Sequence, residues 1–168
     1  MAPKAGGSAA DAQIRALVDN WAKAMRAKDA DGVMAHYAAD SVTFDLAPPL
    51  ISTAADAKGL EAWFATWRGP LGYEIRDLKV TAGDDTAFCH CLCRLSGTKN
   101  EGGTADVWFR LTLCFREIGG RWKIAHQHES VPFYMDGSYR AAVDLQPEGS
   151  ADASRVHLPA RSLSAREA

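Results

Sequence analysis

The feature that most constrains the fold is a change in hydrophobic periodicity near residue 70. Before it, apolar residues recur every three or four positions, which is typical of amphipathic helices. After it, four long runs alternate apolar and polar residues, which is typical of β-strands. We therefore expect an α+β protein in which the helices come first and one antiparallel sheet follows.

Three helices are expected before residue 70. The first has an apolar stripe formed by Ile14, Leu17, Val18, Trp21 and Met25. A short second helix follows the break at Asp29–Gly32, and Thr53 or Asp56 can cap a third helix, which carries Trp63 and Trp67 and ends at Gly69.

A short strand at about 41–46 precedes the third helix, and the four long strands are expected at about 72–82, 86–97, 104–118 and 121–134. Gly119-Gly120 has the composition of a two-residue hairpin turn. Three helices cannot cover both faces of such a sheet. We therefore expect a cone: a strongly curved antiparallel sheet wrapped around three N-terminal helices, with an open mouth.

The chain of 168 residues fits one domain, which we place at 11–146 between an N-terminal tail (1–10) and a poorly structured C-terminal tail (147–168). The formal net charge of −2 and the lack of a basic patch argue against nucleic acid as a partner. No stretch reads as a signal peptide or a membrane span, so we expect a cytoplasmic protein without membrane contact.

The cysteines are expected to be structural thiols. Cys89, Cys91 and Cys93 alternate along one predicted strand and Cys114 lies on the next. Neighbouring thiols on one side of a straight strand are too far apart to form a disulfide without bending the strand, and such a row does not surround one metal ion.

The last predicted strand is the strongest indication of a functional site. Because side chains alternate between the faces of a strand, we expect one face to carry Trp122, Ile124, His126, His128 and Ser130. This face is apolar at one end and ionisable at the other, as in the wall of a ligand pocket.

Several stretches resemble the nuclear-transport-factor-2-like (cystatin-like) superfamily, which includes ketosteroid isomerase, scytalone dehydratase and SnoaL-like cyclases. They are Lys28-Asp-Ala-Asp-Gly32, Tyr37-Ala-Ala-Asp-Ser-Val-Thr-Phe-Asp45 and Gly120-Arg-Trp122-Lys-Ile-Ala-His126-Gln-His128-Glu-Ser130. Phe44-Asp-Leu-Ala-Pro-Pro49, Leu95-Ser-Gly-Thr98 and Ser130-Val-Pro-Phe133 look like an uncharacterised subgroup of ketosteroid isomerase homologues. The resemblance covers roughly residues 10–145 and implies the cone fold.

The resemblance also implies roles for two residues. Asp45 falls where ketosteroid isomerases keep their general base, and Trp21 falls where they keep a tyrosine that donates to the developing enolate. No residue here matches the second donor, a protonated acid. Relatives of this fold mostly use no metal, so we expect neither a metal nor a cofactor.

Other residues are candidates from their own chemistry. His126 and His128 are predicted to carry or return a proton, or, with His90 or His36, to bind a metal ion as a less favoured alternative. Trp21, Tyr37 and Trp63 are expected to form an apolar ligand wall. Arg110 and His90 are included as ligand contacts, although a straight register places Arg110 beside Glu129 on the outer face and only a bulge would bring either into the cone.

Two functions are compatible with these residues. The first is a cofactor-independent isomerase, dehydratase or cyclase that acts next to a carbonyl of a small apolar or aromatic molecule, with Asp45 as base. The second is a non-catalytic module for ligand binding and dimerisation. A homodimer through the outer sheet face is expected in either case, because the strand at 104–118 carries Trp108, Thr112 and Cys114 on its second side.

Overall fold

The computed structural model describes residues 6–149, with side chains from Ala9 onwards. Three helices, α1 (Gly6–Ala27), α2 (Ala30–Met34) and α3 (Ala57–Phe64), precede the long strands, and α1 begins within the segment expected as an N-terminal tail. Most of the expected C-terminal tail lies outside the described residues. Within the described part of the chain, no helix has both the length and the apolar character to cross a membrane.

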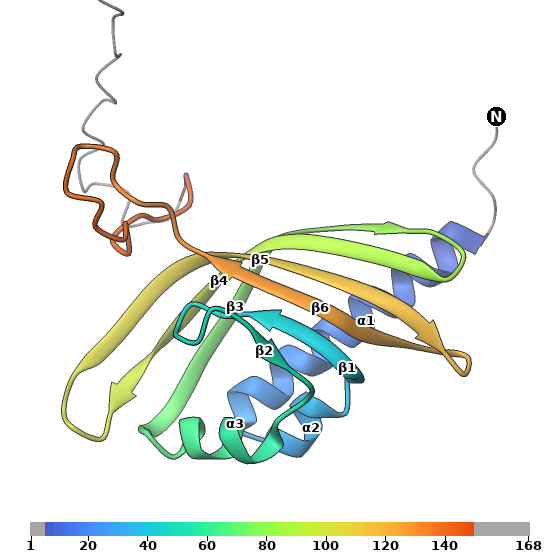
Figure 1. Cartoon of the computed structure of the whole chain (residues 1–168), viewed down its shortest axis with the longest axis horizontal. Helices are drawn as coiled ribbons and strands as arrows, with labels where there is room; N and C mark the ends of the chain where they lie inside the picture. The colour runs from blue at the N-terminus through green and yellow to red at the C-terminus, as the bar shows by residue number, and fades with distance from the viewer. Residues whose placement is uncertain (1–5, 150–168) are drawn as a thin grey trace, which may run out of the picture.

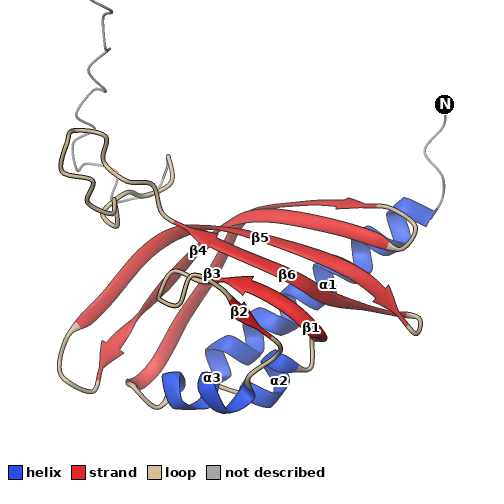
Figure 2. Cartoon of the chain, viewed as in Figure 1, coloured by secondary structure: helices blue, strands red, loops and turns tan. Residues whose placement is uncertain are grey.

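Six strands form one curved sheet beside the helices (Figure 1). Their bounds are β1 (Tyr37–Phe44), β2 (Ser52–Thr53), β3 (Trp67–Ala82), β4 (Thr86–Lys99), β5 (Thr104–Ile118) and β6 (Arg121–Ser130). The strand order is β2-β1-β6-β5-β4-β3, and every neighbouring pair is antiparallel except β1 and β6, which are parallel. The separation of helices and strands is visible in Figure 2, and the α+β prediction is confirmed.

Helix α1 lies against the inner face of the sheet through its predicted apolar stripe. Ile14, Val18 and Trp21 are each at most 1% exposed, and they pack with inward-facing residues of β3, β4 and β5. Basic side chains of α1 and the residue that follows it also reach β3, the strand at the sheet edge. Arg26 donates to the Tyr73 carbonyl at 2.8 Å and Lys28 Nζ to the Trp67 carbonyl at 2.7 Å. These contacts satisfy edge carbonyls that could otherwise pair with another chain.

Each of the short helices α2 and α3 begins after an aspartate that caps its N-terminus. The Asp29 carboxylate accepts a hydrogen bond from the Gly32 amide, and the Asp56 carboxylate accepts one from the Gly59 amide. The third helix ends earlier than predicted. Trp67 is the first residue of β3 instead of the last turn of α3, because it pairs with Lys99 of β4, whose Nζ lies 3.5 Å from the Trp67 ring centroid.

The hairpin between β5 and β6 decides which residues of β6 face inwards. Gly119 and Gly120 have φ values of 59° and 76°, as a two-residue turn of this hand requires, and the strands pair in register from the turn as far as Phe115 opposite Ile124. The next pair is Cys114 opposite His126, so Ala125 has no partner and forms a β-bulge.

Because of the bulge, the residues of β6 after Ala125 face the opposite side of the sheet from the one predicted. Beyond Ala125 the alternation changes phase, so His126, His128 and Ser130 lie opposite the outward residues Cys114, Thr112 and Arg110. Gln127 and Glu129 take the inward positions, opposite the buried Leu113 and Leu111. The prediction that His126, His128 and Ser130 share a face with Trp122 and Ile124 is therefore wrong.

Candidate functional site

The inner face of the sheet carries a cluster of polar and aromatic side chains beneath α1. Tyr37 of β1, Tyr73 of β3 and Trp21 of α1 are all buried. The Trp21 and Tyr73 rings meet edge to face with centroids 5.3 Å apart. The interior therefore combines aromatic walls with hydroxyl and indole groups.

A hydrogen-bonded chain connects this cluster to the end of β6. The Tyr37 hydroxyl donates to Gln127 Oε1, and Gln127 Nε2 donates to Glu129 Oε1 at 2.9 Å. Gln127 is only 6% exposed. Because its amide is engaged at both ends, the orientations of Tyr37, Gln127 and Glu129 are fixed together.

Glu129 is the most perturbed carboxyl group of the cluster. Burial, and after it the negative charge of Asp45, raise its pKa to about 8. Hydrogen bonds from the Leu46 backbone amide and the Gln127 side chain oppose this rise. Glu129 therefore changes protonation state near neutral pH, which most carboxyl groups do not.

Asp45 lies just past the end of β1, and its side chain is exposed. Its Oδ2 accepts a hydrogen bond from Thr43 Oγ1 at 3.1 Å. The negative charge of Asp45 acts on Glu129, so the structure brings these two carboxyl groups near each other. The two carboxyl groups occupy different environments, one at the surface and one partly buried.

Two buried donors near this hydrogen-bonded chain, the Trp21 indole Nε1 and the Tyr73 hydroxyl, form no hydrogen bond of good geometry with the described residues. Trp21 faces Tyr37 and Tyr73 faces Cys93, and in each pair the donor lowers the pKa of the group that it faces. Burial raises the pKa of both tyrosines, and the charge of Glu129 also raises the pKa of Tyr37. Both phenols therefore stay protonated and can donate a hydrogen bond.

Cysteines line the same interior. Cys89, Cys91 and Cys93 are buried free thiols on the inner side of β4, and Cys114 is a free thiol on the outer side of β5. The Sγ atoms of Cys91 and Cys93 are 3.7 Å apart. Burial raises the pKa of Cys89, and contact with Cys91 together with burial raises that of Cys93, which keeps the thiols of Cys89 and Cys93 protonated and unreactive.

The two histidines predicted to act with Asp45 lie on the outer face. His126 Nδ1 is 2.8 Å from the Val42 carbonyl oxygen. Both rings pack edge-on against Phe44, with centroid distances of 4.8 Å for His126 and 5.5 Å for His128. Within residues 9–149, no group of three or more His, Cys, Asp or Glu side chains is placed to hold a metal ion.

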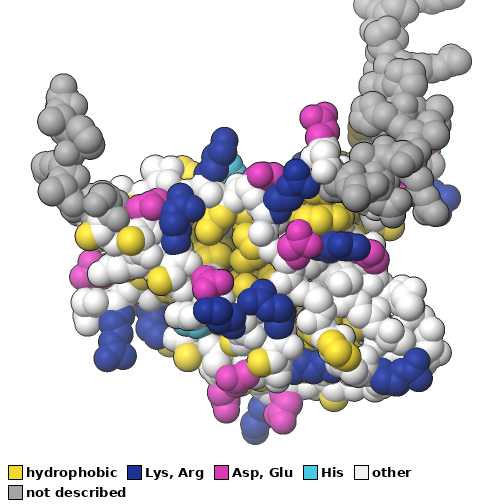
Figure 3. All heavy atoms as spheres, turned by 180° about the vertical axis from the view of Figure 1, so that it is seen from behind, with side chains coloured by type: hydrophobic (Ala, Val, Ile, Leu, Met, Phe, Trp, Pro, Cys, Tyr) yellow, Lys and Arg dark blue, Asp and Glu magenta, His cyan; other side chains and the backbone are white. Residues whose placement is uncertain are grey.

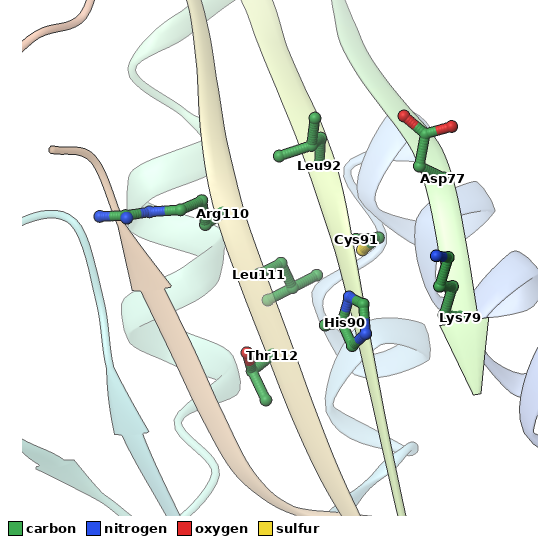
Figure 4. Close-up of a pocket in the computed structure, with 8 residues that line it drawn as sticks. All are labelled: Asp77, Lys79, His90, Cys91, Leu92, Arg110, Leu111 and Thr112. Carbon is green, nitrogen blue, oxygen red and sulfur yellow. The ribbon is translucent and has the colours of Figure 1, made fainter. Parts of the chain in front are cut away.

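The remaining predicted contacts are also separated from Glu129. His90 and Arg110 lie on the outer face, where they line a hollow of about 400 Å3 (Figure 4). The expected Arg110–Glu129 pair is absent, because Arg110 lies opposite Ser130 and the bulge turns Glu129 inwards. Trp63, on α3, packs against Trp67 with ring centroids 5.5 Å apart. Of the predicted site residues, Trp21, Tyr37 and Asp45 lie in or beside the cluster of Glu129.

Sequence reasoning missed Gln127 as a site residue and placed Glu129 outside the cone. One signal could have found them. Ile124 and Val131 both pack towards the core, but they are seven residues apart. Because inward positions of a straight strand differ by an even number, an odd separation indicates a bulge between them.

Chemically, the arrangement suits proton transfer. A carboxyl group whose pKa lies near neutral pH can both accept and donate a proton under physiological conditions. Asp45, Gln127 and Tyr37 surround it with a charge, a fixed amide and a phenol.

The family model described as a SnoaL-like domain matches residues 14–134. Among solved structures, an NTF2-like protein of unknown function from Pseudomonas putida KT2440 is 33% identical, with a TM-score of 0.75, and the match covers 83% of this chain and 98% of that chain. A search of the curated proteins found no match.

Two further solved structures share the fold at lower identity. A ketosteroid isomerase-like protein from Erwinia carotovora atroseptica is 24% identical (TM-score 0.61; 71% of this chain, 93% of that chain). A candidate scytalone dehydratase from Novosphingobium aromaticivorans is 16% identical (TM-score 0.66; 86% of this chain, 96% of that chain). At these identities the similarity concerns the fold alone.

Proposed function

The chain belongs to the SnoaL-like domain family, and on this premise we propose that it binds a small molecule and transfers a proton next to a carbonyl group. The observation that carries the proposal is Glu129, whose pKa is raised to about 8 by burial and by Asp45. A general base works best when its pKa lies near the operating pH. Glu129 meets this requirement at physiological pH.

In the proposed reaction, the Glu129 carboxylate removes a proton from the carbon next to the ligand carbonyl. The same carboxyl group then returns the proton to another atom of the ligand, as in an isomerase, dehydratase or cyclase that needs no cofactor. Gln127 holds Glu129 in place through the 2.9 Å hydrogen bond. A protein described as ketosteroid isomerase-like and a candidate scytalone dehydratase share the fold, which supports this class of reaction by analogy.

The developing negative charge on the carbonyl oxygen requires hydrogen-bond donors. Trp21 Nε1 and the Tyr73 hydroxyl are buried donors that form no hydrogen bond of good geometry with the described residues, and we assign them to this oxygen. The ligand would enter beside the segment at 46–51, in which Leu46, Leu50 and Ile51 are 40%, 96% and 52% exposed. An apolar entrance and donor-rich walls favour an uncharged aromatic or apolar carbonyl compound.

The test is a screen of carbonyl compounds for turnover, followed by Glu129→Gln on any compound that reacts. Glutamine keeps the shape and the contact with Gln127 but cannot accept the proton, so turnover should fall about a hundredfold or more. Glu61→Gln, an exposed glutamate on α3, is the matched control and should leave the rate unchanged. Equal turnover of Glu129→Gln and the wild type would refute the proposed role.

The second candidate function is a non-catalytic module that binds a ligand and forms a homodimer. Its supporting observation is the outer sheet face, where Phe44 and Phe88 are 37% and 45% exposed. Hydrophobic side chains also gather in a patch, bordered by charges of both signs, on the face of the molecule shown in Figure 3. This function predicts no turnover with any compound, and a ligand affinity that depends on Trp21 and Tyr37.

A further inference from the structure

Tyr37 lies between Trp21 and Gln127, and its hydroxyl proton can point only to Gln127. The Trp21 indole faces the Tyr37 hydroxyl. An indole N–H is a donor and has no acceptor atom, so the Tyr37 oxygen can accept from Trp21 but cannot donate to it. The Tyr37 hydroxyl therefore donates to Gln127 Oε1.

This donation selects one of the two orientations of the Gln127 amide. An amide side chain accepts at its oxygen and donates at its nitrogen. Because the oxygen faces Tyr37, the nitrogen is turned towards Glu129, and Nε2 donates to Glu129 Oε1 at 2.9 Å. Gln127 and Tyr37 are 6% and 9% exposed, so protein groups decide between the two orientations and not bulk water.

The bulge at Ala125 makes the contact between Tyr37 and Gln127 possible. Tyr37 pairs with Ile124 in the parallel β1–β6 ladder, whereas Gln127 lies beyond the bulge. Gln127 takes an inward position because the alternation changes phase at Ala125. The irregularity that turns Glu129 inwards therefore also provides the Tyr37 hydroxyl with its acceptor.

We propose that Tyr37 is a positioning residue for Glu129: its hydroxyl proton holds the Gln127 amide with the nitrogen towards the carboxyl group, and this orientation makes Glu129 release its proton more readily. A donor in this place stabilises the carboxylate. An amide oxygen in the same place would accept a hydrogen bond from the protonated acid and stabilise the neutral form. Because Oε1 accepts from Gln127, the proton that Glu129 exchanges with a ligand is carried by Oε2.

Other titratable groups around Glu129 keep their state while Glu129 titrates. Those whose charge interacts with that of Glu129 come from β1 and its end, β3 and β4: Tyr37, Asp45, Tyr73 and Cys93. Burial raises the pKa of both tyrosines, and contact with Cys91 followed by burial raises that of the thiol, so these three groups stay protonated. From β5, the apolar Leu111 lies opposite Glu129. A change in the titration of Glu129 can therefore be attributed to the amide.

The experiment is a 13C NMR titration of the Glu129 carboxyl carbon in the full chain. In Tyr37→Phe the amide is free to turn its oxygen towards the protonated acid, so the midpoint of the titration should rise by about one pH unit. Gln127→Met has a side chain of similar length without the amide and should also raise the midpoint. Tyr134→Phe removes a hydroxyl that is bonded to Asp144 instead, and it should leave the midpoint unchanged.

A double variant separates an effect through the amide from a direct one. If Tyr37 acts through Gln127, Tyr37→Phe/Gln127→Met should titrate as Gln127→Met does. A further rise of the midpoint in the double variant, or an unchanged midpoint in Tyr37→Phe, would overturn the proposal.

The wild type provides a measurement that does not depend on the folding of any variant. Because Nε2 donates to Glu129, the two side-chain amide proton resonances of Gln127 should follow the same titration as the Glu129 carboxyl carbon. Amide resonances that do not respond to this titration would also overturn the proposal.

This inference rests on the proposed function for its catalytic consequence, but its measurements need no substrate. Unchanged turnover in Glu129→Gln would refute the role of Glu129 as base and would leave these titrations as they are. The two proposals can therefore fail separately.

Discussion

Glu129 lies directly opposite Leu111, on the inner face of the sheet, and not beside Arg110 on the outer face. A single unpaired residue, Ala125, produces this placement. Without the bulge, β6 would present its histidines to the interior and its carboxyl group to the surface. The chemistry available to the interior is therefore set by a backbone irregularity rather than by residue type alone.

The raised pKa of Glu129 predicts a pH-dependent stability. Burial, and then the charge of Asp45, raise this pKa from 4.5 to about 8, so between these values the unfolded chain loses a proton that the folded chain keeps. The contribution of Glu129 to the free energy of unfolding is therefore full below pH 4.5 and is lost as the pH rises to about 8. Denaturant titrations should show Glu129→Gln gaining at least about 1 kcal/mol relative to the wild type between pH 5 and pH 8.

The control for this experiment is Glu61→Gln on α3, which should follow the wild type at both pH values. If the difference in the free energy of unfolding between Glu129→Gln and the wild type is the same at pH 5 and pH 8, the pKa of Glu129 is not raised.

Removing the hydroxyl group from each of two buried tyrosines, by substitution with phenylalanine, should have different effects on stability. Tyr37 donates to Gln127, so Tyr37→Phe leaves a buried amide oxygen without its donor and should lower the free energy of unfolding by about 1–3 kcal/mol. The buried Tyr73 hydroxyl forms no hydrogen bond of good geometry and faces only the thiol of Cys93, a weak acceptor, so Tyr73→Phe should leave that free energy unchanged or raise it. Urea denaturation of both variants measures the difference. Equal destabilisation would contradict the assigned hydrogen bond.

The sequence predicts most of the fold because its periodicity reports local geometry. The apolar stripe from Ile14 to Met25 identifies α1, and Gly119-Gly120 identifies the hairpin with its correct starting register. The end of α3 was misplaced, because the pairing of Trp67 with Lys99 is a contact between distant segments that local propensity does not report.

The site is harder to predict for a related reason. Because side chains alternate along a strand, a shift in register reverses the facing of every later residue. The bulge at Ala125 therefore turns Gln127 and Glu129 towards the interior in place of His126 and His128. Residues placed before the bulge or on other elements, such as Trp21 and Tyr37, were not affected by this error. The pKa of Glu129 in turn depends on Asp45, which lies 84 positions away in the sequence.

The proposed homodimer predicts an association that depends on the outer face. Trp108 lies on the outer side of β5, half-buried, with its ring 6.0 Å from the Arg94 guanidinium carbon. Trp108→Glu places a charge in the proposed contact and should convert a dimer into a monomer, as measured by light scattering at micromolar concentration. Glu101→Lys, in the exposed turn between β4 and β5, is the control for a change in charge. A monomeric wild-type protein would contradict the prediction.

The last prediction separates the roles of the two carboxyl groups. If Glu129 is the base, Asp45 acts by raising its pKa, so Asp45→Asn should lower the pKa of Glu129, as observed by 13C NMR titration of its carboxyl carbon. On any compound that the protein converts, the rate of the wild type should rise with pH up to about 8, because the carboxylate is the active form.

In Asp45→Asn this rise in rate should occur at lower pH. At high pH the variant should lose far less of the rate than the hundredfold that Glu129→Gln loses. Asp40→Asn, on the same strand but paired with Arg116, should leave the profile unchanged. If Asp45 itself removes the proton, as the sequence predicted, Asp45→Asn will instead lose about a hundredfold at every pH, and Glu129→Gln will retain most of the rate.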